Sequence, residues 1–154
     1  MNIRSRRSWW LALGLVLPIA LAAQGATQPA QDRQAFLDYP LTLPRANELI
    51  AAMGEMTKYM VSRPDLATVM ARSKTMTRPE LIAQMERDPK SMAIVKPHGL
   101  SARDYVYGVP ALRMAMMAAQ GLSGPTVIAS PANVAFAKAN LATLKPKMDA
   151  AEGR

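Results

Sequence analysis

The chain has 154 residues, of which 50% are apolar and 19% charged, and its formal net charge is +8. It contains no cysteine, which excludes disulfide frameworks, thiolate zinc sites, iron–sulfur clusters, a cysteine nucleophile and covalently attached c-type haem. Aromatic residues make up only 5% of the chain, so few rings are available to stack on bases or sugars. The length fits one globular domain with an appendage.

The first 25 residues have the composition of an export signal. Three arginines, at positions 4, 6 and 7, precede an almost unbroken apolar stretch, Trp9–Ala23, and small residues suited to signal peptidase follow. As a helix, these 15 residues span about 22 Å, against about 30 Å for the acyl core of a bilayer. We therefore expect a cleaved signal peptide over 1–25 and a periplasmic or secreted protein. The alternative is a retained anchor that holds the protein on the membrane, facing the periplasm.

The leader also contains a Ser-Arg-Arg triplet, Ser5–Arg7, followed one residue later by the aromatic Trp9. This segment resembles the twin-arginine export signal, although Trp9 stands where that pattern usually has phenylalanine. The resemblance implies that the protein folds before export. If the leader is of the ordinary kind, the two arginines only orient it.

The net charge of the chain without the leader is modest. Without Arg4, Arg6 and Arg7, residues 26–154 carry 16 basic and 11 acidic side chains, a net charge of +5. The basic residues are dispersed and are not interleaved with aromatic residues, so we expect no nucleic-acid binding. This charge suits loose association with anionic lipid or envelope polymers, or ordinary solubility.

The mature chain begins with a proline-containing stretch, 26–43, that shows no periodicity and is expected to be a flexible tether. A helix is expected over 44–63, because Leu49, Met53, Met56 and Met60 recur on one face.

Three short helical segments should follow. Pro64 suits the first turn of a helix that runs to about residue 74, with its apolar side chains facing inward. Thr77 and Glu80 form a capping box that opens a helix over about 78–87. A further turn extends from residue 89 to 95.

The longest apolar segment, Ala102–Gln120, is apolar nearly all round and should be the central helix. Ser101 caps it, with Asp104 three residues later in the same pattern as Thr77 and Glu80, and Ser130 caps the last helix. Pro146 should interrupt this last helix, so that residues 147–154 form a frayed tail. No stretch alternates apolar and polar residues as a strand does. The prediction is an all-α domain over 44–146, an irregular bundle of about five short helices.

Three sequence elements make the chain resemble a known group of proteins: Leu41–Pro44, Gly99–Tyr105 and Ser130–Phe136. Together with the leader and the methionine-rich first helix, they make the chain similar to a group of small exported α-helical proteins of environmental bacteria. The resemblance covers most of residues 41–145. It implies export and a helical fold, and it implies no activity.

Residues that could support catalysis are few. His98 is the only histidine, which excludes metal sites built on two histidines, and no nucleophile elbow is present. We interpret His98 as a turn residue, and the acidic side chains near helix ends as caps. The sequence therefore predicts no enzymatic activity, no catalytic residue and no cofactor.

The 12 methionines are the unusual feature of the composition. One group lies on one face of the first helix, and a second group lies on the central helix. Such spacing is typical of core packing, for which methionine is well suited. Thioethers are also soft ligands for cuprous ion, and methionine with histidine can ligate haem. The metal candidates are Met53, Met56, Met60, His98, Met114 and Met117, although core packing explains each methionine cluster sufficiently.

Three hypotheses about function remain. The first is an exported, non-enzymatic helical domain that binds another protein or the cell envelope, since the fold signals agree while motifs for catalysis are missing. The second is an accessory subunit of a membrane complex that keeps its leader as an anchor, which is the one case in which we expect membrane contact. The third is a copper or haem carrier that uses methionine and histidine.

Overall fold

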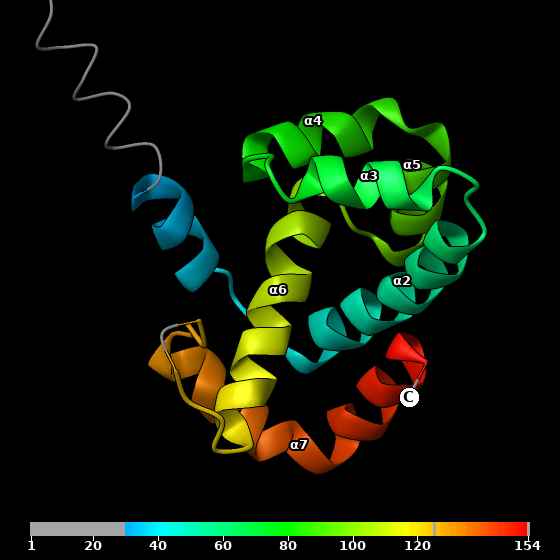
Figure 1. Ribbon diagram of the computed structural model, residues 1–154. Helices are drawn as coiled ribbons and strands as arrows, with labels where there is room; N and C mark the ends of the chain where they lie inside the picture. Colours follow the sequence, from blue (N-terminus) through cyan, green and yellow to red (C-terminus); the bar gives the residue numbers. More distant parts are fainter. Residues whose placement is uncertain (1–29, 125, 154) are drawn as a thin grey trace, which may run out of the picture. The chain divides into compact units, whose positions relative to one another are not determined.

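The computed structural model describes residues 30–124 and 126–153 (Figure 1). The predicted signal peptide, 1–25, lies outside the described residues. In the described part, every regular element is helical, which confirms the all-α prediction. The chain divides into two units, Met1–Arg33 and Gln34–Arg154. The second unit contains six α-helices and one 3-10 helix with defined bounds: α2 (Leu43–Val61), α3 (Leu66–Ser73), α4 (Arg78–Arg87), α5 (Pro89–Val95), η1 (Lys96–His98), α6 (Ala102–Ala119) and α7 (Pro131–Glu152).

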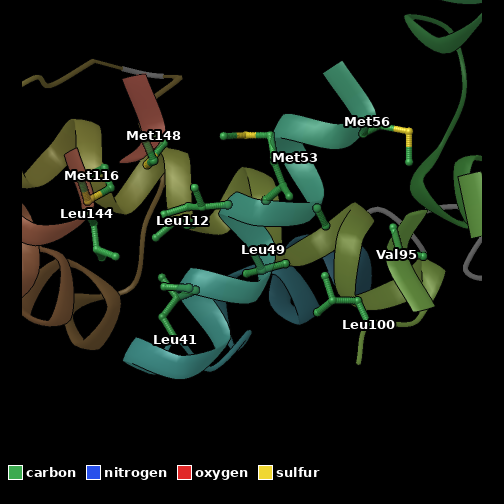
Figure 2. Close-up of a cluster of buried hydrophobic side chains, with 14 of the residues drawn as sticks. Leu41, Leu49, Met53, Met56, Val95, Leu100, Leu112, Met116, Leu144 and Met148 are labelled. Atoms are coloured by element: carbon green, nitrogen blue, oxygen red, sulfur yellow. The ribbon is translucent and has the colours of Figure 1, made fainter. Parts of the chain in front are cut away.

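The core is built mainly between α2, α6 and α7. The predicted face of α2 is buried: Leu49 is fully buried, and Met53 and Met56 are almost fully buried. Met60 is partly buried and packs against the edge of the main apolar cluster. Leu112 and Met116 of α6 and Leu144 of α7 complete the centre (Figure 2). The period of apolar residues in the sequence therefore predicts the buried faces of these helices.

Local capping interactions fix where several helices begin. In both α4 and α6, the cap hydroxyl accepts from the backbone N–H three residues on, and the acid there accepts from the backbone N–H of the cap residue. These are the two predicted capping boxes, Thr77 with Glu80 and Ser101 with Asp104. Each box satisfies two amides that have no partner within the helix.

The C-terminal helix differs from the expectation of a frayed tail over 147–154. Helix α7 continues through Pro146 to Glu152, and Gly153 ends it with a positive φ of 75°. Proline costs a helix one hydrogen bond, but Leu144 and Met148 are buried on either side of it. Their burial stabilises the helix across the proline.

The predicted tether, 26–43, is also more ordered than expected over its described part. Residues 30–37 are helical, and Phe36 is buried in a second apolar cluster with Tyr107 and Ala111. The carbonyl of Tyr39 accepts from the buried side-chain amide of Asn133 at 2.9 Å. This stretch contains few apolar residues, and Phe36 is buried because it packs against α6. A contact with a distant helix leaves no local pattern in the sequence, so it could not be predicted.

Helix α3 corrects a third expectation. The sequence predicts that its apolar residues face inward, but Leu66 and Val69 are only half-buried and Met70 is 51% exposed. No residue of α3 is fully buried or belongs to either apolar cluster.

Within the described residues, we find no helix with both the length and the apolar character needed to cross a bilayer.

Candidate functional site

A pocket with a volume of about 330 Å³ lies between α6 and α7, and four of its nine lining residues are methionines. We call it the methionine pocket. Its lining residues are Arg113, Met114, Met116, Met117, Gln120, Lys145, Met148, Asp149 and Glu152. This volume is at the lower end of the range that proteins use for ligand pockets.

The apolar lining combines anchored and adaptable side chains. Met116 and Met148 are almost fully buried, and Figure 2 shows them with Leu112 and Leu144 in the core. Met114 and Met117 are only partly buried, and Met117 belongs to neither apolar cluster. Because it lies outside both clusters, Met117 contributes to the pocket without being required by the core.

Two ion pairs also line the pocket. The Nε of Arg113 lies 3.0 Å from Oε1 of Glu152, which joins α6 to α7. On α7, Lys145 pairs with Asp149 one turn later. The side-chain amide of Gln120 donates to the carbonyl of Met116 at 3.0 Å. The two cations therefore each have an anion beside them, and the border carries no excess charge.

A second depression, of about 640 Å³, lies between α2 and α7. Most of its apolar lining consists of small groups such as Ala51, Gly54, Ala150 and Ala151, beside the larger Ile50. It is larger and more open than the methionine pocket, so it would enclose a bound group less completely. We therefore place the candidate site in the methionine pocket.

The structure separates the six metal candidates into three places. Met53 and Met56 are in the core and Met60 is at its edge, all on α2. Met114 and Met117 line the methionine pocket on α6. His98, in η1, contacts Glu55 of α2 and does not line the methionine pocket. The six candidates do not form one site.

His98 has a partner of its own. Its Nε2 lies 3.0 Å from Oε1 of Glu55 on α2, and the carboxylate is largely exposed. The carbonyl of the next residue, Gly99, accepts from Arg45. This arrangement fits the predicted role of His98 as a turn residue, because both contacts hold the turn against α2.

Two carboxylates are enclosed by hydrogen bonds. Burial by itself raises the pKa of Asp88, but hydrogen bonds from Ser91, Tyr59 and the Lys90 N–H outweigh it, so that the pKa is lowered. Burial likewise raises the pKa of Asp104, but hydrogen bonds from Ser101 outweigh this effect, so that its pKa lies below the usual value. Both groups remain ionised near neutral pH, which suits caps and not proton carriers.

Tyr39 donates from its hydroxyl to Asp104 at 3.3 Å. Burial, together with the charge of that carboxylate, raises the pKa of Tyr39 to about 12. The tyrosine therefore keeps its proton at any pH at which the protein is expected to work. This contact ties the segment before α2 to the first turn of α6.

Met148 and the two ion pairs are parts of the site that the sequence did not predict. The sequence groups Met116 with Met114 and Met117 on the central helix, whereas it places Met148 and Glu152 in a frayed tail. A signal was present, since Met148 follows the last apolar face of α7 at the i+4 spacing from Leu144. Among the described residues, no group of three or more His, Asp or Glu side chains is placed to hold a metal ion.

Comparisons of the chain with protein-family models, with curated proteins and with solved structures returned no match. The function of the chain is therefore inferred from its own geometry.

Proposed function

We propose that this protein is an exported, non-enzymatic helical domain that binds another protein through the methionine pocket. The observation that carries the proposal is that four thioether side chains line one surface pocket whose bordering charges neutralise each other. Methionine is flexible and polarizable, so a methionine-lined surface adapts to apolar side chains of different shapes. A partner that inserts apolar residues from an amphipathic helix fits such a pocket.

The border of the pocket favours a protein over a small polar ligand. A small-molecule site usually aims a few polar groups at its ligand to fix its orientation. Here Arg113 pairs with Glu152, and Lys145 pairs with Asp149. These pairs resemble the polar rim that surrounds the apolar centre of a protein interface.

The chemistry of the described residues supports a binding role. The carboxylates with lowered pKa values cap helices or pair with neighbours, as Asp88, Asp104 and Glu80 do. General acid–base catalysis instead uses groups whose pKa lies near the working pH. The groups that the structure encloses are held away from that range.

A second candidate function is transport of cuprous ion, and the observation that favours it is the same set of thioethers. Met114, Met116, Met117 and Met148 place soft sulfur ligands around one pocket. We expect the purified protein to hold no stoichiometric copper or haem, because the core accounts for two of these side chains. Copper at about one ion per chain would favour this second function.

Two substitutions of Met117 separate the two functions. Met117→Leu keeps an apolar side chain but removes the sulfur, whereas Met117→Glu places a charge in the pocket. Protein binding should survive Met117→Leu and be lost in Met117→Glu. Cuprous ion binding, measured by competition with a chromogenic chelator, should already weaken in Met117→Leu.

The binding measurement uses a photoreactive amino acid in place of Gln120, which lines the pocket and is exposed. The same amino acid at Lys138, exposed on α7 outside the pocket, is the control. In the native host we expect one discrete crosslinked partner from position 120, retained in Met117→Leu and lost in Met117→Glu. Equal crosslinking from position 138, or an adduct unaffected by Met117→Glu, would contradict the proposal.

A further inference from the structure

Helix α3 is amphipathic, yet the domain does not bury its apolar side chains. Leu66, Val69 and Met70 have the i, i+3, i+4 spacing of one helix face. None of these residues is buried, and none packs in either apolar cluster. Leu66 and Val69 are half-buried, Met70 is 51% exposed, and Val61, the last residue of α2, is 71% exposed. The domain thus leaves the apolar face of α3 partly exposed, with Met70 and Val61 as its most exposed apolar side chains.

The charges around this apolar face are mostly positive. The segment 61–78 contains four basic residues and one acidic residue, Asp65. Arg63 holds Asp65 through two hydrogen bonds of 2.9 Å each, which neutralises that carboxylate. Arg72 and Lys74 are exposed at the end of the helix. Arg63 is itself paired, with Asp65 and with Asp88, so the cations that border the apolar face are Arg72 and Lys74.

We propose that α3 and the turn before it bind the surface of an anionic lipid bilayer. Short amphipathic helices bind such surfaces by inserting apolar side chains at the level of the headgroups, while basic side chains contact anionic lipid. A partner groove normally takes apolar anchors over two turns, from i to i+7. The apolar face of α3 covers little more than one turn, so a headgroup layer suits it better.

This surface is independent of the methionine pocket. The pocket is formed by α6 and α7, and no residue of α3 lines it. Failure of one proposal therefore leaves the other intact, because the two are tested with substitutions in different helices.

The absence of cysteine allows a test that reports on one position of the full chain. Met70→Cys and Leu122→Cys are labelled separately with a polarity-sensitive dye. Leu122 is 53% exposed, so the two sites are matched in exposure. On addition of vesicles of phosphatidylcholine with phosphatidylglycerol, we expect a blue shift at position 70 and none at position 122. Both variants carry the same leader, so its contribution to binding is common to them.

Charge substitutions complete the test. At about fivefold per basic residue near the membrane, Arg72→Gln with Lys74→Gln should weaken the vesicle affinity reported at position 70 about 25-fold. Lys96→Gln with Lys138→Gln removes the same charge from exposed sites outside α3 and should change it little. No shift at position 70, equal shifts at both positions, or equal loss in the two charge variants would overturn the proposal.

Discussion

Leu112 of α6 and Met148 of α7 are single side chains on which we expect the fold to depend. Leu112 is 2% exposed and lies in the centre of the core, and Met148 is 7% exposed on the facing helix. Both belong to the same apolar cluster. The sequence indicates the importance of Leu112, whereas Met148 gains its importance from the unexpected continuation of α7.

Truncating either side chain should destabilise the protein. Leu112→Ala and Met148→Ala should each lower the free energy of unfolding by about 2–5 kcal/mol, through lost burial and a residual cavity. Met148 should lie at the lower end, because it also borders the pocket. Leu122→Ala, at an exposed site, should change it by no more than about 0.5 kcal/mol. Urea unfolding measures all three, and a cost at Met148 as small as that at Leu122 would place α7 outside the core.

Asp88 joins the end of α2 to the start of α5. It accepts from Ser91 at 2.7 Å, from Tyr59 at 3.1 Å and from the Lys90 N–H at 3.1 Å. These bonds favour the ionised form over the burial that opposes it, so the pKa in the folded state is lowered. The carboxylate therefore contributes stability above its unfolded pKa, and this contribution is lost as the pH falls through the folded value.

Asp88→Ala tests this linkage. It should lower the free energy of unfolding by about 1–3 kcal/mol at pH 7, since a cap and hydrogen bonds to a charged group are lost. The difference from the unsubstituted protein should shrink below about pH 4, where the carboxyl begins to take up a proton. Urea titrations at pH 7 and pH 3 give both values. A difference that is the same at the two pH values would mean that the charge of Asp88 has no part in the effect.

At the scale of whole elements, two glycines lie where helices approach each other closely, and only one of them is required there. A Cβ atom at Gly108 of α6 would lie 2.8 Å from Leu49 Cδ2 and 2.8 Å from Tyr39 Cζ. Leu49 is fully buried and has no room to move. A Cβ atom at Gly54 of α2 would meet its nearest neighbour, on Ala151, at 3.4 Å, an ordinary contact. Glycine is therefore required sterically at the first position and not at the second.

Gly108→Ala and Gly54→Ala form a matched pair. Alanine favours a helix over glycine by about 1 kcal/mol. At Gly54 this gain should appear as an equal or higher melting temperature. At Gly108, overpacking of about 1–3 kcal/mol should outweigh it and lower the melting temperature. Thermal unfolding followed by circular dichroism compares them, and a gain at Gly108 would show that α2 and α6 are less tightly packed than described.

The starts of the helices could be predicted from the sequence, because capping is local. Thr77 with Glu80 and Ser101 with Asp104 act through the backbone three residues away. The continuation of α7 past Pro146 could not be predicted, because it depends on Leu144 and Met148 being buried against other helices. The methionine pocket escaped prediction for the same reason, since it exists only where α6 approaches α7.

At the scale of the whole molecule, the proposed export with cleavage of the leader would determine which chromophores the protein retains. Trp9 and Trp10 are the only tryptophans, and both precede the expected cleavage sites near residue 25. A processed protein should therefore show tyrosine fluorescence alone and fractionate with soluble exported proteins. Emission spectra and fractionation of protein isolated from its native host check this. Indole emission with membrane fractionation would instead indicate a retained anchor and a membrane-bound subunit.

Because α3 lies outside the apolar clusters, the chain could be cut next to it without removing a buried residue. A cut after Lys74, in the exposed stretch that comes after α3, would leave α2 on one fragment and α4 to α7 on the other. Because α2 packs against both α6 and α7, its contacts would then join the two fragments without a peptide bond between them, while α6 and α7 would stay packed together on one fragment. We therefore expect the two pieces, made separately, to associate through the surface that α2 covers in the intact domain.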